Sequence, residues 1–518
     1  MAASLTACLP EINFSKSPSP TATTAASVDP ASSPSPEPTP TAIPGPDRPS
    51  YPPSDAKPAG FTTAPKGAGL SGYLLQKIKW KKCSGGECAT VLAPLDYSHP
   101  AEQALTLSLK RIKASKSPKI GTLFINPGGP GASGVEYVTG FARKGLERFD
   151  IVGWDPRGVG GSTPVKCFGD KDADKLNALD FSPDTAKERQ QLIDADRAFG
   201  KSCWEHSGVL LEHISTVETV KDLDLLRQLV GDKKLTYLGY SYGTAIGATY
   251  AELFGANIRQ MVLDAAVDIA DNDEVIQAQG FDTALEHFAS WCAKRRCSLG
   301  NSAKKVISKL GDWLDKLDQK PVKSGSRKLT QTLAMLGIGI FLYSGENGWP
   351  SLLQAVNEAM KGKPAWLLMA GDSLNGRDPD GSYSSLFYSF NAISCLDYSD
   401  EGLAQADKDW EADKKKAPFF GKYFGPGYLC PVWPVRPSPE LTITGPDAPP
   451  ILVVGATGDN ATPYQQAVDM AKQLVSGVLV TYQGEGHGAF GGNSTCIDKI
   501  VIKYLVDGTV PKDGVKCK

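Results

Sequence analysis

This 518-residue sequence lacks long apolar runs, has almost no net charge and contains no zinc-type cysteine pairs. No segment has the ~20 consecutive apolar residues that a membrane-spanning helix requires. The formal net charge of −2 argues against a nucleic-acid partner. No two cysteines have the C-x-x-C spacing of a zinc site, so we expect no metal, and no motif implies an organic cofactor. An apolar share of 41% is enough for a full core, which indicates a globular protein.

Large apolar side chains are also rare near the start of the chain. Residues 15–58 are dominated by Ser, Pro, Thr and Ala, and such a segment cannot bury enough surface to offset the entropy of ordering. We therefore expect residues 1–59 to form an extended, disordered tether, with the folded part beginning near Gly60. Cys8 ends the sequence L-T-A-C, which resembles a bacterial lipobox, although only seven residues precede it. A lipid anchor at Cys8 and simple secretion both remain open.

Eleven cysteines are present, and ten of them fall within the predicted folded region. Without zinc-type spacing, this number is typical of a protein that folds in an oxidising compartment outside the cytoplasm. The order of the cysteines along the chain suggests five local disulfides: Cys83 with Cys88, Cys167 with Cys203, Cys292 with Cys297, Cys395 with Cys430, and Cys496 with Cys517.

The most informative motif is G-Y-S-Y-G at residues 239–243, between an apolar strand-like run and a helix-like segment. A serine hydroxyl is a weak nucleophile unless it is held clear of the backbone, beside a base and close to oxyanion donors. A sharp turn from strand to helix presents the serine in this way, and its tight backbone needs glycine two residues before and two after. The pattern predicts a nucleophile elbow with Ser241 as the nucleophile.

A base and an acid follow Ser241 in the order found in α/β-hydrolases. His487 lies in a glycine-rich loop after the strand-like residues 478–482, and of the five histidines it alone comes late enough. Asp459 follows the apolar run 451–454, which is typical of a buried parallel strand. We predict that Asp459 orients His487 and that His487 takes the proton of Ser241. An Asx turn before Pro463 is the simpler alternative for Asp459.

Two backbone amides should bind the oxyanion. The first is that of Tyr242, directly after the nucleophile. The second should come from N-P-G-G-P-G, residues 126–131, where we choose Gly129 and keep its neighbour Gly128 as an alternative. The same stretch also fits the dinucleotide pattern G-x-G-x-x-G, with Asp155 as a ribose-binding acid. That alternative is weakened because about a hundred β-rich residues precede the motif and the triad requires the same fold.

Taken together, these motifs and D-P-R-G at residues 155–158 resemble the tripeptidyl and prolyl aminopeptidase branch of the α/β-hydrolases. The resemblance runs from about Trp80 to the C-terminus. It is closest to secreted actinobacterial tripeptidyl-aminopeptidase-like enzymes, which end in a cysteine pair like Cys496 and Cys517. Proline iminopeptidases usually carry histidine before Gly-Gly-Pro-Gly, whereas this chain has Asn126-Pro127, which favours the tripeptidyl-like group.

The predicted fold is α/β: a mostly parallel central sheet with an inserted, mainly helical lid. A capping box at residues 215–218 predicts a crossover helix, and residues 352–360 have a helical pattern. We expect a hydrolase core at 60–271, the lid at 272–438 and the rest of the core at 439–518. The predicted strands are 73–79, 89–95, 105–112, 122–126, 151–155, 235–238, 261–264, 451–454 and 478–482.

The resemblance and the triad together predict a secreted serine exopeptidase that acts on peptides from a free N-terminus. A charged substrate amine should face a carboxylate. Asp264, at a strand end, and Asp397, in the lid, are candidates by location, with turn or surface acids as the simpler alternative. A carboxylester or lactone hydrolase on the same fold is the first alternative function, and a catalytically silent binding protein is the second.

Overall fold

The computed structural model describes residues 46–67, 69–269 and 275–518. Cys8, most of the predicted tether and the predicted start of the lid at residue 272 lie outside the described residues. None of the described helices combines the length and the apolar character needed to cross a bilayer.

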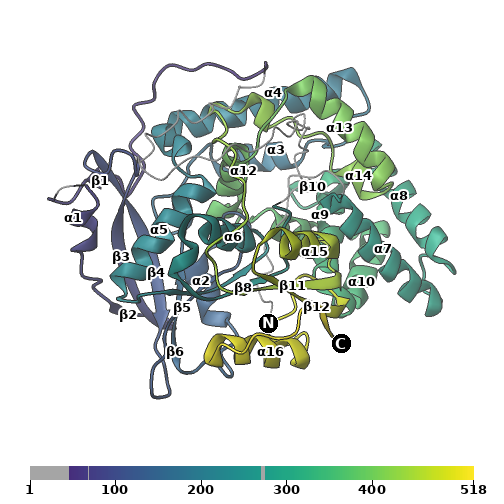
Figure 1. Cartoon of the computed structure of the whole chain (residues 1–518). Coiled ribbons are helices and arrows are strands. Elements are labelled where there is room, and N and C mark those ends of the chain that lie inside the picture. The colour runs from purple at the N-terminus through teal and green to yellow at the C-terminus, as the bar shows by residue number, and fades with distance from the viewer. Residues whose placement is uncertain (1–45, 68, 270–274) are drawn as a thin grey trace, which may run out of the picture.

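One large sheet organises the molecule, and most of its strands are parallel. Its strands are β1 (Thr62–Thr63), β2 (Lys81–Cys83), β3 (Gly86–Pro94), β4 (Gln103–Ile112), β5 (Gly121–Asn126), β6 (Phe149–Trp154), β7 (Leu235–Tyr240), β8 (Ile258–Asp264), β11 (Ile451–Gly458), β12 (Gly477–Glu485) and β13 (Val515–Cys517). They lie in the order β13-β12-β11-β8-β7-β5-β6-β4-β3-β2, with β1 paired to β4 (Figure 1). All pairs from β13 to β6 are parallel, and those from β6 to β2 are antiparallel.

Alternate side chains of the central strands enter two separate cores. In β5, Leu123 and Ile125 pack on one face, whereas Phe124 packs on the other. The first face is covered by α2 (Gly134–Gly140) and α16 (Thr495–Asp507). The second is covered by α5 (Thr216–Leu229), α6 (Tyr242–Phe254) and α15 (Tyr464–Gln473), as Figure 1 shows. The parallel sheet is thus buried on both sides, which explains the continuous apolar runs of its strands.

Helix α5 begins where the capping box was predicted, but only half of the box is present. The Ser215 hydroxyl accepts a hydrogen bond from the Glu218 amide. The Glu218 side chain does not reach back. It accepts instead from Arg157 Nη1 at 3.1 Å and from Lys221 Nζ at 2.8 Å. Arg157 is buried and also pairs with Asp222, and it binds the Glu218 carboxylate that would otherwise complete the capping box.

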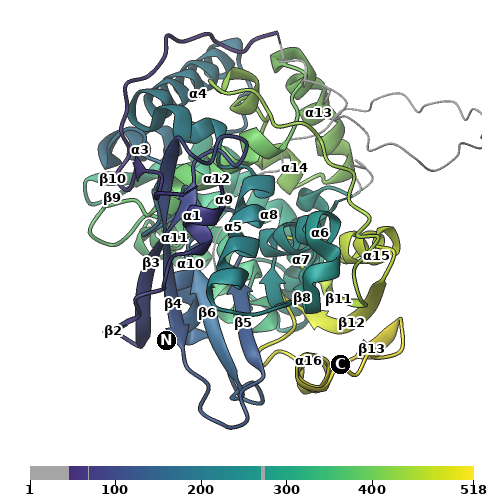
Figure 2. The same ribbon diagram turned by 60° about the vertical axis from the view of Figure 1, so that its left-hand side comes forward.

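A mainly helical insertion lies between β8 and β11, as predicted. It has its own apolar core and, among the described residues, only one small hairpin, of β9 (Val322–Ser324) and β10 (Arg327–Leu329). Figure 2 shows its helices grouped beyond the carboxyl ends of the strands. They are α7 (Gln277–Lys294), α8 (Ala303–Gln319), α9 (Gln331–Leu342), α10 (Trp349–Met360), α11 (Ala365–Leu374), α12 (Ser385–Asp397), α13 (Leu403–Lys416) and α14 (Phe420–Tyr423).

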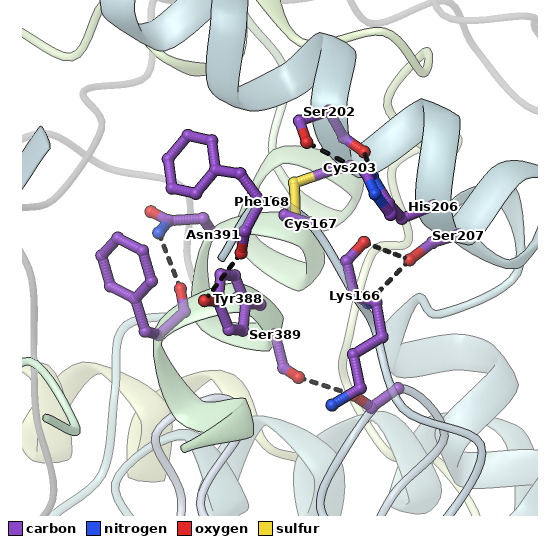
Figure 3. Close-up of a disulfide and its surroundings, with 12 residues drawn as sticks. Lys166, Cys167, Phe168, Ser202, Cys203, His206, Ser207, Tyr388, Ser389 and Asn391 are labelled. Atoms are coloured by element: carbon purple, nitrogen blue, oxygen red, sulfur yellow. Dashed lines mark hydrogen bonds between the residues drawn. A yellow bond between two sulfur atoms is a disulfide. The ribbon is translucent and has the colours of Figure 1, made fainter. Parts of the chain in front are cut away.

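Two further helices, α3 (Asp170–Asn177) and α4 (Ala186–Ser207), lie between β6 and β7. The disulfide Cys167–Cys203 joins α4 to the chain after β6, and Figure 3 shows its surroundings. Beside it, the Ser207 hydroxyl donates to the Lys166 carbonyl at 2.6 Å. These bonds fix α4 against the core.

All five predicted disulfides are present, which confirms the pairing suggested by their order along the chain. The strand predictions from 89–95 onward are also confirmed, with β3 to β8, β11 and β12 at those places.

The predicted strand at residues 73–79 is wrong. This segment instead contains the end of the short helix α1 (Ser71–Leu74), followed by irregular chain. Gln76 explains the difference, because its side-chain amide hydrogen-bonds both the N–H and the C=O of Leu92 at 2.8 Å. One side chain thereby occupies backbone groups that a neighbouring strand would have paired.

The part of the chain that is held against the protein begins before Gly60, the predicted start of the folded part. Arg48 forms an ion pair with Asp400 and donates to the Trp433 carbonyl at 2.7 Å. Trp204 Nε1 donates to the Pro52 carbonyl at 2.8 Å. Residues 46–58 lack strands and helices, but such contacts hold them on the surface. Composition could not reveal these anchors, which depend on single polar contacts with distant residues.

Candidate functional site

Ser241 lies between β7 and α6 in a strained turn. Its backbone dihedrals are φ 54° and ψ −128°, a region that non-glycine residues rarely adopt. The turn is held because the Ser241 amide donates to the Asp264 carbonyl at 3.1 Å, and the Thr244 amide donates back to the Ser241 carbonyl at 2.7 Å. Strain of this kind persists only where the surroundings determine it, and it is typical of functional sites.

The two flanking glycines are required by space. A Cβ on Gly239 would lie 2.3 Å from the Gly243 carbonyl oxygen, and one on Gly243 would lie 2.9 Å from the Asn126 carbonyl oxygen. Both distances are too short for a real Cβ, so the chain can close this turn only with glycine at both positions. The local geometry is that of the predicted nucleophile elbow.

Asp459 and His487 come together from the ends of neighbouring strands. Asp459 follows β11, His487 follows β12, and His487 Nδ1 lies 2.8 Å from Asp459 Oδ1. The same carboxylate oxygen accepts from the Ala461 and Thr462 amides, at 3.0 and 2.9 Å. These bonds fix the carboxylate, which in turn fixes the tautomer that carries its proton on Nδ1.

The remaining nitrogen of His487, Nε2, is buried and makes no hydrogen bond with any described residue. It is therefore available to accept a proton. The contact between a nucleophile and its base is often loose in free enzymes and tightens when substrate binds.

The electrostatic surroundings favour the charged form of His487. Burial opposes the positive charge, but the neighbouring Asp459 carboxylate outweighs burial, and Asp264 adds a smaller effect, so the pKa of His487 is raised above its usual 6.5. Its ring also meets the Tyr343 ring edge to face at 5.3 Å, and its amide donates to the Tyr343 carbonyl at 3.0 Å. Tyr343 follows helix α9, so the lid helps to hold the histidine loop.

The predicted oxyanion donors lie on two sides of Ser241. Tyr242 is the first residue of α6, where backbone amides have no partner within the helix. In the loop after β5, the Gly128 amide already donates to Asn126 Oδ1 at 2.9 Å, whereas Gly129 lines the cavity beside Ser241. Glycine is needed at position 128 for a different reason: a Cβ there would lie only 2.8 Å from Ser241 Cβ.

A cavity of about 480 Å³ opens beside Ser241. One face of α12 lines it with Phe387, Phe390, Asn391, Ser394 and Asp397. One face of α4 adds Leu192, Asp196 and Phe199. The remaining lining comes from the core loops and the lid, so the cavity has the size and the mostly apolar wall of a small-molecule or peptide site.

The two predicted amine-binding acids lie in different places. Asp264 is fully buried and does not line the cavity. Its carboxylate accepts from the Ala489 amide at 3.1 Å and the Phe490 amide at 2.7 Å, and burial raises its pKa to about 6. Asp397 does line the cavity. It accepts from the Thr216 amide and hydroxyl at 2.8 and 2.6 Å, and burial raises its pKa to about 7.

Asp155, which the dinucleotide alternative assigns to ribose binding, instead forms hydrogen bonds that hold the surrounding loops. Its carboxylate accepts from the Ser133 hydroxyl at 2.6 Å and from the Gly161 amide at 2.8 Å. Among the described residues, no three His, Cys, Asp or Glu side chains converge as metal ligands would.

Sequence reasoning missed Tyr343 and Asp196. Nothing near Tyr343 in the sequence indicates a contact with a histidine so far along the chain. Asp196 left a weak signal, since it lies among the apolar positions Leu192 and Phe199 of one helix face, where a carboxylate is unusual.

The sheet order, the strained elbow after β7, and the acid and histidine after β11 and β12 define an α/β-hydrolase. Comparison with known sequences places the chain within this class. A family model described as "TAP-like protein" matches residues 417–517. Serine protease Hip1 of Mycobacterium tuberculosis is 37% identical over 481 residues, which cover 86% of this chain and 91% of Hip1. The chain belongs to the TAP-like family of α/β-hydrolases.

Two other relatives are named for different substrates. Carboxylesterase B of M. tuberculosis is 35% identical over 458 residues, covering 83% of this chain and 86% of the relative. Tripeptidyl aminopeptidase of Streptomyces lividans is 28% identical over 472 residues, covering 85% of this chain and 86% of the relative. The three names include both peptide and ester hydrolysis.

Proposed function

We propose that the protein is an extracytoplasmic serine peptidase that removes short units from the free N-terminus of peptides. One observation carries this proposal: the cavity beside Ser241 is lined by four acidic side chains, those of Asp196, Asp268, Asp397 and Glu440, and no Lys, Arg or His is among its described lining residues. Such a cavity favours a substrate end that is positively charged. A peptide with a free α-amine has one, and a simple acyl ester does not.

The reaction begins at Ser241. His487 Nε2 takes the hydroxyl proton while the serine oxygen attacks the scissile carbonyl, and Asp459 stabilises the imidazolium that forms. His487 then gives the proton to the leaving amine. Water then hydrolyses the acyl-enzyme, with His487 and Asp459 acting as in the first step, and frees Ser241.

The amides of Tyr242 and Gly129 bind the oxyanion of both tetrahedral intermediates. The choice of Gly129 is supported by its position on the cavity wall and by the bond that occupies the Gly128 amide. Each such donor typically contributes ~3–4 kcal/mol to the stabilisation of the transition state.

Helix α12 of the insertion and helix α4 of the core both contribute to the cavity wall. We propose that this wall admits the end of a peptide chain but stops a folded polypeptide from passing through. Of the two amine-binding candidates, the placement of Asp397 in the cavity supports such a role more than the placement of Asp264 does. For Asp264 we propose a positioning role.

Five disulfides support a location outside the cytoplasm. We further propose that Cys8 is the site of a lipid anchor. Mass spectrometry of the protein from membrane and soluble fractions tests this, because a lipidated Cys8 would appear only in the membrane fraction.

The decisive experiment offers one short peptide amide with a free and with an acetylated N-terminus, beside a simple acyl ester. We expect kcat/KM for the free peptide to exceed that for the acetylated one by about tenfold to hundredfold. Equal rates for the two peptides, with faster cleavage of the ester, would favour the carboxylesterase alternative, which the relative named Carboxylesterase B supports. No turnover of any substrate would favour a silent binding protein.

A further inference from the structure

We propose that Asp196 binds the positively charged α-amine of the substrate and thereby sets the length of the unit that is removed. This inference rests on the proposed aminopeptidase function and assigns its specificity to a residue on α4. It is based on a carboxylate that the fold buries in the cavity wall without a partner.

Asp196 differs from the other acids of the cavity in what surrounds it. It is 9% exposed, lines the cavity, and makes no hydrogen bond or ion pair with any described residue. Burial alone raises its pKa to about 8. Ionising a carboxyl group in such a place costs free energy, and only a bound cation would offset that cost.

The other three acids that line the cavity either have a partner within the protein already or are exposed to solvent. Asp397 accepts two hydrogen bonds from Thr216, and Asp268 has a partner within the protein. Glu440 is exposed, so water solvates its charge and its attraction for an amine is weak. Asp196 therefore stands to gain more from an incoming ammonium group than any of these three.

The position of Asp196 is rigid. Phe199, one turn further along the same helix, packs against the rings of Phe168, Phe387 and Trp433. Cys203, one more turn along, is bonded to Cys167 (Figure 3). A carboxylate held this firmly fixes how far the amine can lie from Ser241.

A fixed distance between Asp196 and Ser241 selects one length of the peptide unit that is removed. An extended peptide advances about 3.3–3.6 Å per residue, so only a unit of matching length can place its amine at Asp196 and its carbonyl at Ser241 together. A shorter unit leaves the amine unpaired in an apolar wall, and a longer one does not fit.

The test compares wild type with Asp196→Asn on free-amine peptide amides whose cleaved unit grows from one to four residues. The matched control is Asp194→Asn, the same change at an exposed position of the same helix. For wild type and control we expect one preferred length. For Asp196→Asn we expect KM for that length to rise about tenfold to hundredfold and the preference for one length to disappear, with acetylated peptides unaffected.

Thermal unfolding completes the test. An aspartate whose pKa is raised to about 8 must take up a proton when the chain folds at neutral pH, whereas asparagine need not, and the change breaks no bond. We therefore expect the Tm of Asp196→Asn to equal or exceed that of wild type. A clear fall in Tm would mean that the fold itself uses the carboxylate, and it would overturn the proposal. Unchanged KM and length preference in the folded variant would overturn it too.

These outcomes are distinct from failure of the proposed function. If wild type itself cleaves free and acetylated peptides equally, the aminopeptidase function is wrong, and the role of Asp196 falls with it. If wild type discriminates and Asp196→Asn still does so, the function stands and only the assignment of Asp196 is wrong.

Discussion

The backbone amide of Ser241 donates to the backbone carbonyl of Asp264, with nitrogen and oxygen 3.1 Å apart. The side chain of the same aspartate accepts from the amides of Ala489 and Phe490, which closely follow His487. One residue at the end of β8 therefore ties the nucleophile elbow to the histidine loop. Mutual placement of Ser241 and His487 depends on this link.

Asp264→Asn tests the link. Asparagine keeps the volume but has one acceptor oxygen, and its NH₂ group would face an amide donor. We expect kcat to fall about tenfold to hundredfold, since an unsatisfied buried donor costs ~1–3 kcal/mol. Because the Asp264 charge also helps to raise the pKa of His487, the acid limb of the pH profile should move to lower pH.

The control for this variant is Asp232→Asn. Asp232 accepts from the Thr122 amide at 2.7 Å at the other end of β5, so the same change there alters a similar carboxylate–amide bond far from the site and still leaves one acceptor oxygen for it. An Asp264→Asn enzyme with wild-type kcat and an unmoved acid limb would contradict the positioning role.

Ser241→Ala should abolish hydrolysis of peptides and esters alike. The hydroxyl forms the covalent bond but contributes little packing, so we expect a loss of ~10³-fold or more with an unchanged Tm. His487→Ala should behave similarly. Asp459→Asn should be severely impaired, because the amide favours the wrong imidazole tautomer. A purified Ser241→Ala protein that keeps most of its activity would exclude Ser241 as the nucleophile.

Gly128→Ala should inactivate the enzyme by displacing the elbow. The new Cβ would lie 2.6 Å from the Tyr240 carbonyl oxygen and 2.8 Å from Ser241 Cβ, at a φ of +95°. Gly231→Ala is the matched control, with a φ of +86° and nothing within 4 Å of the new Cβ. It shares the backbone strain of about 1–2 kcal/mol without the clash. Similar activity of the two purified variants would show that the contact with Ser241 is unimportant.

Loss of the Cys167–Cys203 disulfide should destabilise the protein more than loss of Cys83–Cys88. The two bonds close loops with sequence separations of 36 and 5 residues. The chain-entropy model gives a difference of about 1.7 kcal/mol, from 1.5RT ln(36/5). Urea unfolding of the two paired Cys→Ala variants measures it. Equal free energies of unfolding would mean that loop entropy does not govern these bonds.

Much of the site follows from local sequence because the chemistry is concentrated at strand ends. Ser241 and Asp459 each follow an apolar run typical of a buried strand, His487 follows the more exposed strand β12, and parallel strands bring their carboxyl ends to one edge of the sheet. The glycines beside Ser241 are equally local, since steric contacts within the turn require them. Such features depend on a few neighbouring residues, and one sequence is enough to predict them.

The contact that we propose for specificity, and the one that supports the histidine loop, are not local. Asp196 enters the cavity only because α4 is fixed by Cys203 and packed on α12, and Tyr343 meets His487 only because the lid folds back over the sheet. The wrong strand at 73–79 has a related cause, since a single hydrogen-bonding side chain, Gln76, overrides the strand pattern. Pairings between distant segments leave no periodic signal in the sequence.

The final prediction concerns pH. In the proposed mechanism hydrolysis needs neutral His487, whose pKa is raised above 6.5 because the Asp459 and Asp264 carboxylates outweigh its burial. Activity should therefore be low in acid and rise with pH through a midpoint above 6.5. An uncharged acyl ester is the substrate of choice, because a peptide amine would add the titrations of Asp196 and Asp397, which face the cavity. The midpoint should change little between low and high salt, since the Asp459–His487 pair is buried and poorly screened. A midpoint well below 6.5, or one that falls steeply with added salt, would contradict a buried carboxylate as the cause.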